Sequence, residues 1–247
     1  MNQTGRTALI TGSGRNIGRA AAIALAKQGF NVVVNGSNDR MACEDTATAV
    51  MAVGGACHIA MGDVGFKDEC DEIVAQAMSR FGRVDVLVNN AAIRPSTPFL
   101  EMDEAEWNRV IAIGMQAAFW LARATLPGMV ERGWGRIINF AGMNAIHGYN
   151  GRAHVSVAKH GAWGLAKALA KEFGPKGITA NIISPGPISG QHKDAAMSAH
   201  IAETAARVPV GRTGTPEEVA AVVALLASDD GAFINGQLIQ VNGGAET

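Results

Sequence analysis

The stretch Thr11-Gly12-Ser13-Gly14-Arg15-Asn16-Ile17-Gly18 decides the fold, because it joins a strand-like segment, Ala8–Thr11, to a strongly helical one, Ala20–Ala26. Glycines at such a junction let the backbone approach a phosphate group. The free N–H groups and the dipole of the following helix then favour the negative charge. A glycine cluster alone also fits a purely structural turn, so the rest of the chain must decide between these interpretations.

Strand-like and helix-like segments alternate along the whole chain. The strand-like segments are short, apolar and rich in β-branched residues: Ala8–Thr11, Asn31–Asn35, Ala56–Met61, Val84–Asn89, Arg136–Phe140, Thr179–Ser184 and Leu238–Val241. The helix-like segments have apolar residues at helical spacing: Ile17–Gln28, Glu69–Phe81, Glu104–Glu131, Val155–Phe173 and Pro216–Leu226. The alternation predicts one α/β domain over residues 1–247, a doubly wound (Rossmann) fold with a seven-stranded, mostly parallel sheet and helices on both faces.

Composition narrows the class of protein further. The 247 residues carry a formal net charge of −1, and the basic residues are scattered, so neither nucleic acid nor an anionic membrane is an expected partner. Three cysteines without CxxC spacing suggest neither a disulfide framework nor a metal site. The first strand begins close to Met1, and no apolar run approaches the roughly 20 residues of a membrane span. We expect a soluble, cytoplasmic protein that binds a small-molecule substrate.

One long segment departs from the strand and helix alternation. Residues 187–212 carry Gly190 and several polar residues, and they follow the strand that ends near Ser184. In a doubly wound fold, a segment that follows the carboxyl end of a strand borders the ligand crevice. We therefore expect a substrate lid around 187–212.

Several motifs in order make the chain resemble the short-chain dehydrogenase/reductase family, in its classical, FabG-like form. Thr11, Gly12 and Gly18 match the family's TGxxxGxG turn, and Asn16 replaces the middle glycine. Asparagine is the residue that best tolerates left-handed backbone angles after glycine, so we expect the turn to form. The other similar motifs are Asp63-Val64, Asn89-Asn90-Ala91-Ala92, Pro185-Gly186-Pro187-Ile188, Gly211-Arg212 with Pro216-Glu217-Glu218-Val219, and Gly236 with Val241-Asn242-Gly243-Gly244.

The resemblance implies a nicotinamide dinucleotide and the residues that bind it. These are Gly12, Ser13, Gly14, Arg15, Asn16, Ile17, Gly18, Asn35, Gly36, Ser37, Asp63, Val64, Asn90, Ala91, Ala92, Lys159, Pro185, Gly186 and Ile188. No acid stands within Asn35-Gly36-Ser37-Asn38, where NAD-preferring relatives hold the ribose, and Arg15 occupies a position that is basic in NADP-preferring relatives. NADP is therefore preferred over NAD. The alternatives are a solvated Arg15 and an Asp39 that turns inward.

The resemblance also implies a catalytic tetrad of asparagine, serine, tyrosine and lysine, and most of it is missing. Lys159 is present, but Gly114, Gly142 and Val155 stand at the asparagine, serine and tyrosine positions. Glycine and valine have no side-chain proton to donate. A general acid or base typically contributes 10²–10⁴-fold, so the usual mechanism would be severely slowed.

Replacement proton donors are His147, Tyr149 and His154, which with Lys159 form our candidate catalytic set. Each of the three also has a structural interpretation, as a packing or surface residue. Arg94 and Arg152 are candidate clamps for an anionic substrate, although solvated arginines are commoner.

Two functions fit these observations. The first is an NADP(H)-dependent oxidoreductase that interconverts a small carbonyl compound and its alcohol with an atypical proton donor. The second is a non-redox protein on the same fold, either a lyase or isomerase or a catalytically inactive cofactor-binding subunit, because a fold does not fix a function. The resemblance further implies a homotetramer, with the helices Glu104–Glu131 and Val155–Phe173 at one interface.

Overall fold

A seven-stranded parallel sheet forms the centre of the computed structural model, which describes residues 5–143, 147–190, 205 and 208–246. In spatial order the strands are β3 (Cys57–Met61), β2 (Asn31–Gly36), β1 (Thr7–Ile10), β4 (Val86–Asn89), β5 (Gly135–Phe140), β6 (Ile178–Pro185) and β7 (Leu238–Val241). Every neighbouring pair is parallel. The strand order reverses between β1 and β4, and ligands bind at such a switch point in open α/β sheets.

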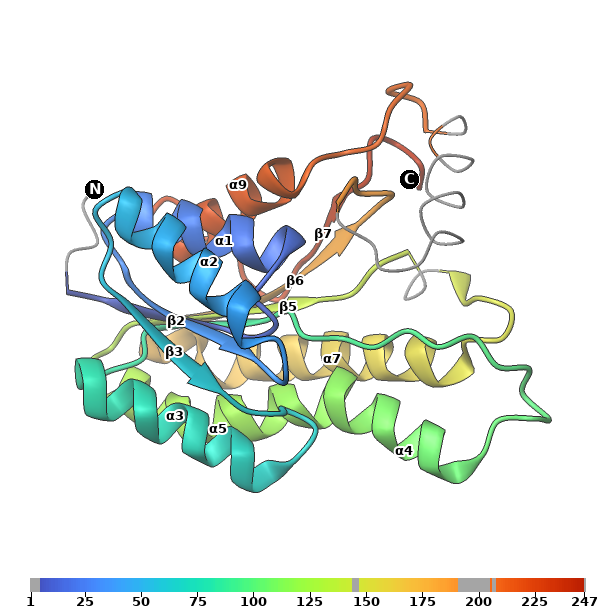
Figure 1. Cartoon of the computed structure of the whole chain (residues 1–247), viewed down its shortest axis with the longest axis horizontal. Helices are drawn as coiled ribbons and strands as arrows, with labels where there is room; N and C mark the ends of the chain where they lie inside the picture. Colours follow the sequence, from blue (N-terminus) through green and yellow to red (C-terminus); the bar gives the residue numbers. More distant parts are fainter. Residues whose placement is uncertain (1–4, 144–146, 191–204, 206–207, 247) are drawn as a thin grey trace.

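Helices cover both faces of the sheet (Figure 1). One layer contains α1 (Asn16–Lys27), α2 (Arg40–Ala52) and α9 (Pro216–Ala227). The other contains α3 (Lys67–Phe81), α4 (Glu104–Ile111), the π-helical turn η1 (Ala112–Gln116), α5 (Ala117–Glu131) and α7 (Ala153–Phe173). A short 3₁₀ turn, η2 (Gly174–Lys176), leads into β6. The doubly wound fold predicted from the alternation is confirmed.

Both faces of the central strands are buried, which explains their continuous apolar sequences. Leu9, Val33 and Leu87 pack under the α3 and α5 layer. Ala8 and Val34, which alternate with them along β1 and β2, pack under the α1 and α9 layer. The sheet is therefore sealed on both sides, and its accessible region is the edge where the strands end.

Two elements differ from the sequence-based prediction. Helix α2 was not anticipated, because the residues it buries include the small or polar Cys43, Thr46 and Ala47, which give little helical hydrophobic pattern. The predicted helix Glu104–Glu131 is interrupted by η1, a π-helical turn. Such turns are rare and occur frequently at functional sites.

Among the described residues, one helical stretch, Glu104–Glu131, is long and apolar enough to cross a membrane by length and composition, with a mean hydropathy of 1.3 over its best 18 residues. The expectation that no segment approaches this length was wrong. Leu121, Ala122 and Leu126 of the stretch are buried in the core beneath the sheet. This packing is that of a core helix in a doubly wound protein.

The predicted lid falls mostly outside the described residues, at 191–204, 206 and 207. Its described beginning is tied to the chain that precedes α9. Ile188 pairs with Gly214 in an isolated parallel bridge, and the N–H of Ser189 donates to the carbonyl of Gly214 at 2.8 Å.

Candidate active site

The turn between β1 and α1 has the geometry of a phosphate cradle. Asn16 has a φ of 48°, and it is the only non-glycine residue with a positive φ in the described part of the chain. The prediction that asparagine would replace glycine in this left-handed position is confirmed. A Cβ on Gly18 would lie 2.5 Å from the carbonyl oxygen of Gly12, so the backbone is too tight for any side chain. The side chain of Arg15, the N-cap residue of α1, makes no capping hydrogen bond, and the N-terminus of a helix is a favourable place for an anionic group.

The end of β4 holds this turn in place. The amide of Asn90 donates to the carbonyls of Thr11 and Gly12 at 3.0 and 2.9 Å. The backbone N–H groups of Asn90 and Ala91 donate to the hydroxyl of Thr11 at 3.0 and 3.1 Å. Ser13 points inward, where it is buried and donates to the carbonyl of Ile10 at 2.8 Å. The family's asparagine motif therefore has a structural task here, which is to fix the phosphate turn.

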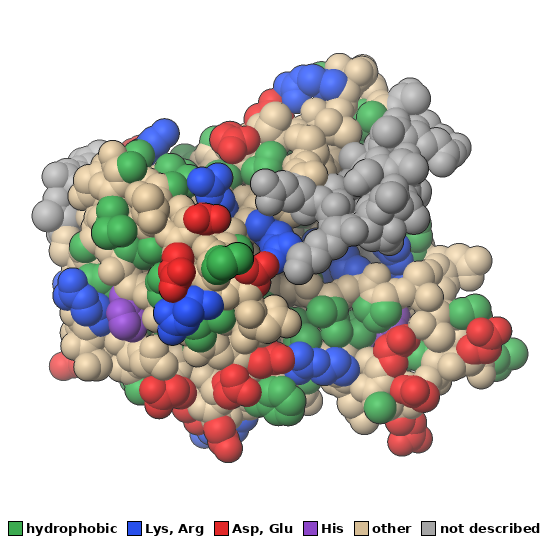
Figure 2. Space-filling model, in the orientation of Figure 1, with side chains coloured by type: hydrophobic (Ala, Val, Ile, Leu, Met, Phe, Trp, Pro, Cys, Tyr) green, Lys and Arg blue, Asp and Glu red, His purple; other side chains and the backbone are tan. Residues whose placement is uncertain are grey.

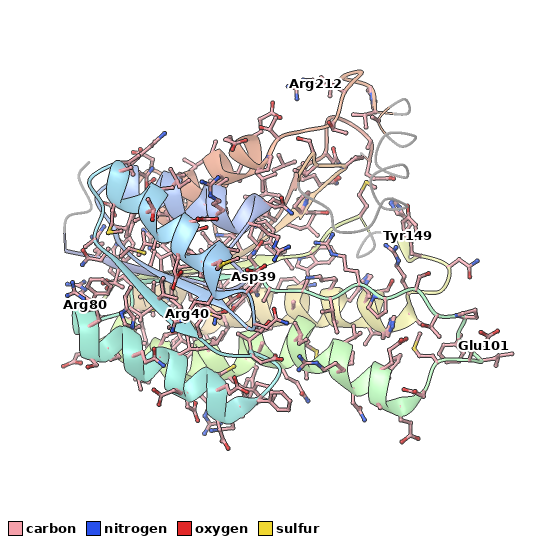
Figure 3. All side chains as sticks on the ribbon, viewed as in Figure 1. Asp39, Arg40, Arg80, Glu101, Tyr149 and Arg212 are labelled. Carbon is pink, nitrogen blue, oxygen red and sulfur yellow. The ribbon has the colours of Figure 1, made fainter. Side chains whose placement is uncertain are left out.

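A crevice of about 570 Å³ begins at this turn and runs along the ends of the strands. Every residue that the resemblance assigns to the cofactor lines the crevice, apart from Ser13. Asp39 and Tyr149, which also line it, come from opposite halves of the chain and are labelled in Figure 3. The volume lies within the range of small-molecule sites, and the glycine cradle fits a dinucleotide's phosphates.

Two ion pairs line the crevice. Arg15 pairs with Asp39 at 2.5 Å, and Asp39 also accepts a hydrogen bond from the N–H of Ala42 as the cap of α2. Asp63 pairs with Arg109 of α4 and accepts from the N–H of Gly65 at 2.8 Å. Sequence reasoning missed Arg109, because an arginine on a helix is ordinarily a solvated surface residue and only the tertiary structure brings it to the crevice.

Lys159 of α7 also lines the crevice. It is 5% exposed, and its ammonium group donates to the carbonyl of Phe140 at 2.7 Å. Burial disfavours the charged form, and Arg94 repels it, so the pKa of Lys159 is lowered to about 7. Both protonation states of this lysine are therefore populated near neutral pH.

The three positions at which the resemblance implies asparagine, serine and tyrosine line the same cavities as Lys159. Val155 and Gly142 line the crevice with it, and Gly142 has a φ of 126°, in a region that favours glycine. Gly114 lies in η1, where an added Cβ would approach the Cβ of Ala158 to 2.9 Å. Gly114 and Lys159 also line a cavity of about 10 Å³, roughly the size of one water molecule. The backbone thus disfavours a side chain at Gly142 through its φ angle and at Gly114 through the contact with Ala158.

The candidate replacement donors fall into two groups. Tyr149 lines the crevice and is 39% exposed, with its ring 5.6 Å from the guanidinium carbon of Arg152. His147 instead pairs with Glu246 at 2.9 Å, and the fully buried His154 pairs with Glu106 at 3.1 Å. Neither histidine lines the crevice. The structure thus brings together Lys159 and Tyr149 and leaves the two histidines outside.

The fold and site together define a class of protein. A parallel doubly wound sheet, a glycine-rich turn at the start of the first helix and a crevice at the switch point are the features of a dinucleotide-dependent enzyme. Lys159, buried at the crevice with a pKa near neutrality, adds a group of the kind found at catalytic sites.

Comparison with known proteins identifies the family within this class. A family model described as enoyl-(acyl carrier protein) reductase matches residues 12–246. The chain is 36% identical over 242 residues to a 3-oxoacyl-[acyl-carrier-protein] reductase of Synechocystis, covering 98% of this chain and 97% of the relative. It is 38% identical to an acetoacetyl-CoA reductase of Rhizobium meliloti, covering 97% and 98%.

A solved structure from Beutenbergia cavernae, described as an NAD(P)-dependent gluconate 5-dehydrogenase with bound NADP, is also similar. It has a TM-score of 0.89 and 33% identity, covering 99% of this chain and 98% of that one. The chain belongs to the short-chain dehydrogenase/reductase family, in the FabG-like group. It is thus of the NAD(P)-dependent oxidoreductase type.

Proposed function

We propose that this protein is an NADP(H)-dependent oxidoreductase that interconverts a small carbonyl compound and its alcohol, with Lys159 as the proton donor. The observation that carries the proposal is the position of Lys159, at a crevice where Val155, Gly142 and Gly114 offer no proton. NADP is the cofactor. When bound, it supplies or accepts the hydride. The similar Beutenbergia structure with bound NADP supports this choice, as does the absence of an acid within Asn35–Asn38.

Lys159 has the chemistry of a general acid at neutral pH. A protonated lysine has three N–H donors, and the carbonyl of Phe140 uses one of them. Two donors remain for a cofactor hydroxyl and for the oxygen of the reacting carbonyl group. A pKa of about 7 makes proton transfer efficient in both directions, because neither form of the group is scarce.

Tyr149 is the second group in the crevice that can donate a proton. Its ring packs beside Arg152, and its position on the loop before α7 places it at the rim of the crevice. The test of the proposed function therefore compares Lys159→Met with Tyr149→Phe.

The experiment follows NADPH oxidation with a panel of ketones and aldehydes. We expect steady turnover with at least one compound, a loss of 10²–10⁴-fold in kcat for Lys159→Met, and less than a threefold change for Tyr149→Phe. Tight NADPH binding without turnover of any compound would instead support a non-redox protein on this fold. Loss of activity in Tyr149→Phe alone would assign the proton to Tyr149.

A further inference from the structure

We propose that the carbonyl substrate carries an anionic group, a carboxylate or a phosphate, which binds between the guanidinium groups of Arg94 and Arg152. This inference rests on the proposed function, because it names the substrate class of the same crevice. Both arginines line the crevice together with Lys159 and Val155.

Two segments bring the arginines together from distant parts of the chain. Arg94 follows β4, and Arg152 immediately precedes α7. The N–H of Thr97 donates to the carbonyl of Gly151 at 2.8 Å, so the two segments run side by side. A Cβ on Gly151, which has a φ of 71°, would lie 2.9 Å from the hydroxyl of Ser96. The close approach of these segments therefore depends on a glycine directly before Arg152.

Neither arginine side chain forms an ion pair or hydrogen bond with any residue that the structure describes, and the contact of Arg152 is with the ring of Tyr149. The carboxylates of the surrounding segments are engaged elsewhere. Asp39 pairs with Arg15, Asp63 with Arg109, Glu106 with His154 and Glu246 with His147. The cationic side chains of the described crevice thus outnumber the acids that could neutralise them.

The cations repel one another. Arg94 is exposed and Arg152 is half-buried. The positive charge of Arg152 lowers the pKa of Arg94, and burial together with the charge of Arg94 lowers the pKa of Lys159. Neighbouring like charges are unfavourable unless an opposite charge accompanies them. Figure 2 shows Lys and Arg side chains in the hollow of the molecular surface beside the grey atoms. A bound anion would relieve this repulsion, and arginine forks match carboxylate and phosphate oxygens in pairs.

The anion has a consequence for catalysis. A negative group beside Arg94 offsets the repulsion that Arg94 exerts on Lys159, and it therefore favours the protonated lysine. Substrate binding would thus favour protonation of Lys159, and carbonyl reduction consumes this proton. A neutral carbonyl compound would lack this effect.

The experiment uses matched pairs of compounds with the full-length protein and NADPH. The carboxylate pairs are acetoacetate with methyl acetoacetate and levulinate with methyl levulinate, and the phosphate pair is dihydroxyacetone phosphate with dihydroxyacetone. We expect the charged member of at least one pair to have at least a tenfold higher kcat/KM. Arg94→Gln and Arg152→Gln should each remove this preference, mainly by raising KM for the charged member more than for the neutral one. Arg80→Gln, an exposed position on α3 far from Tyr149 in Figure 3, is the control and should change neither.

The outcomes separate the substrate class from the redox function. Turnover in which neutral compounds equal or exceed their charged partners in every pair would overturn the anionic substrate and leave the redox function intact. If no compound is turned over, calorimetry still tests the anion site. The protein is first saturated with NADP⁺ and is then titrated with acetoacetate or with inorganic phosphate. Binding that is lost in Arg94→Gln and Arg152→Gln supports the anion site, and no binding to the unaltered protein overturns it.

Discussion

Burial and the neighbouring charge of Arg94 strongly lower the pKa of Lys159. Its folded-state pKa of about 7 lies below the value of 10.5 for a free lysine, so between these pH values the unfolded chain binds more protons than the folded one. Stability therefore rises with pH across this window, by up to about 1.4 kcal/mol per pH unit for one proton. Below pH 7 both states are protonated, and the full cost of burying the charge is present.

We expect this dependence to vanish in Lys159→Met. In chemical unfolding of the cofactor-free protein, the free energy of unfolding of the unaltered chain should rise relative to that of the variant from pH 7 to about pH 10. Lys171→Met, an exposed position on the same helix, is the control and should track the unaltered chain. Parallel curves for Lys159→Met and the unaltered protein would show that Lys159 is not buried as a near-neutral amine.

A second prediction for a single residue concerns Arg15, which we expect to favour NADP over NAD. Arg15→Met should weaken NADPH binding by 10- to 100-fold, the value of one hydrogen-bonded charge, and should leave NADH binding within threefold. Dissociation constants measured by fluorescence titration check this expectation. Asp39→Asn should tighten NADPH, because it frees Arg15 from its ion pair while asparagine still caps α2. Equal losses for both nucleotides in Arg15→Met would contradict the assignment.

At the scale of elements, Glu106 connects three segments. Its carboxylate contacts His154 of α7 at 3.1 Å and accepts from the hydroxyl of Thr97 at 3.1 Å. Glu106 itself belongs to α4, so one side chain ties α4 to α7 and to the segment that carries Arg94. His154 therefore makes a structural contact in this fold, whereas its place beside Val155 in the sequence left both a chemical and a surface role open.

Glu106→Ala should lower the free energy of unfolding by about 1–3 kcal/mol, because it leaves the buried ring of His154 without its partner. Denaturant titration measures the change. Glu101→Ala, an exposed position before α4 that is labelled in Figure 3, should change stability by less than about 0.5 kcal/mol. A loss in Glu106→Ala no larger than in this control would show that the tie does not contribute to stability.

The elements also show what a sequence can reveal. The strands and the phosphate turn were predictable because burial on both faces leaves apolar runs and because the turn needs glycine or asparagine at fixed places. Helix α2 and the π turn η1 were not, since neither leaves a hydrophobic period of its own. The crevice positions of Arg94, Arg109 and Arg152 depend on tertiary contacts, such as the one between Thr97 and Gly151, which the sequence does not reveal.

At the scale of the whole molecule, apolar side chains remain on the layer formed by α5 and α7. Phe119 and Val157 are each 46% exposed. Exposed apolar patches of this kind often mark protein interfaces. We expect a homotetramer built through these helices, with a mass in light scattering near four times the 25.6 kDa of the chain. Phe119→Glu with Val157→Lys should dissociate it, and an unaltered mass in that variant would place the interface elsewhere.

The proposed proton donor depends on one lysine, on the helix that carries it and on the crevice that buries it. The most direct test is the pH dependence of kcat/KM for NADPH-dependent carbonyl reduction by the unaltered protein and by Lys159→Met, because kcat/KM reports the substrate-free site. We expect kcat/KM of the unaltered protein to fall about tenfold per pH unit above an apparent pKa near 7, and that of the variant to be at least 100-fold lower without that inflection. An unchanged inflection and rate in Lys159→Met would contradict the assignment of the proton to Lys159.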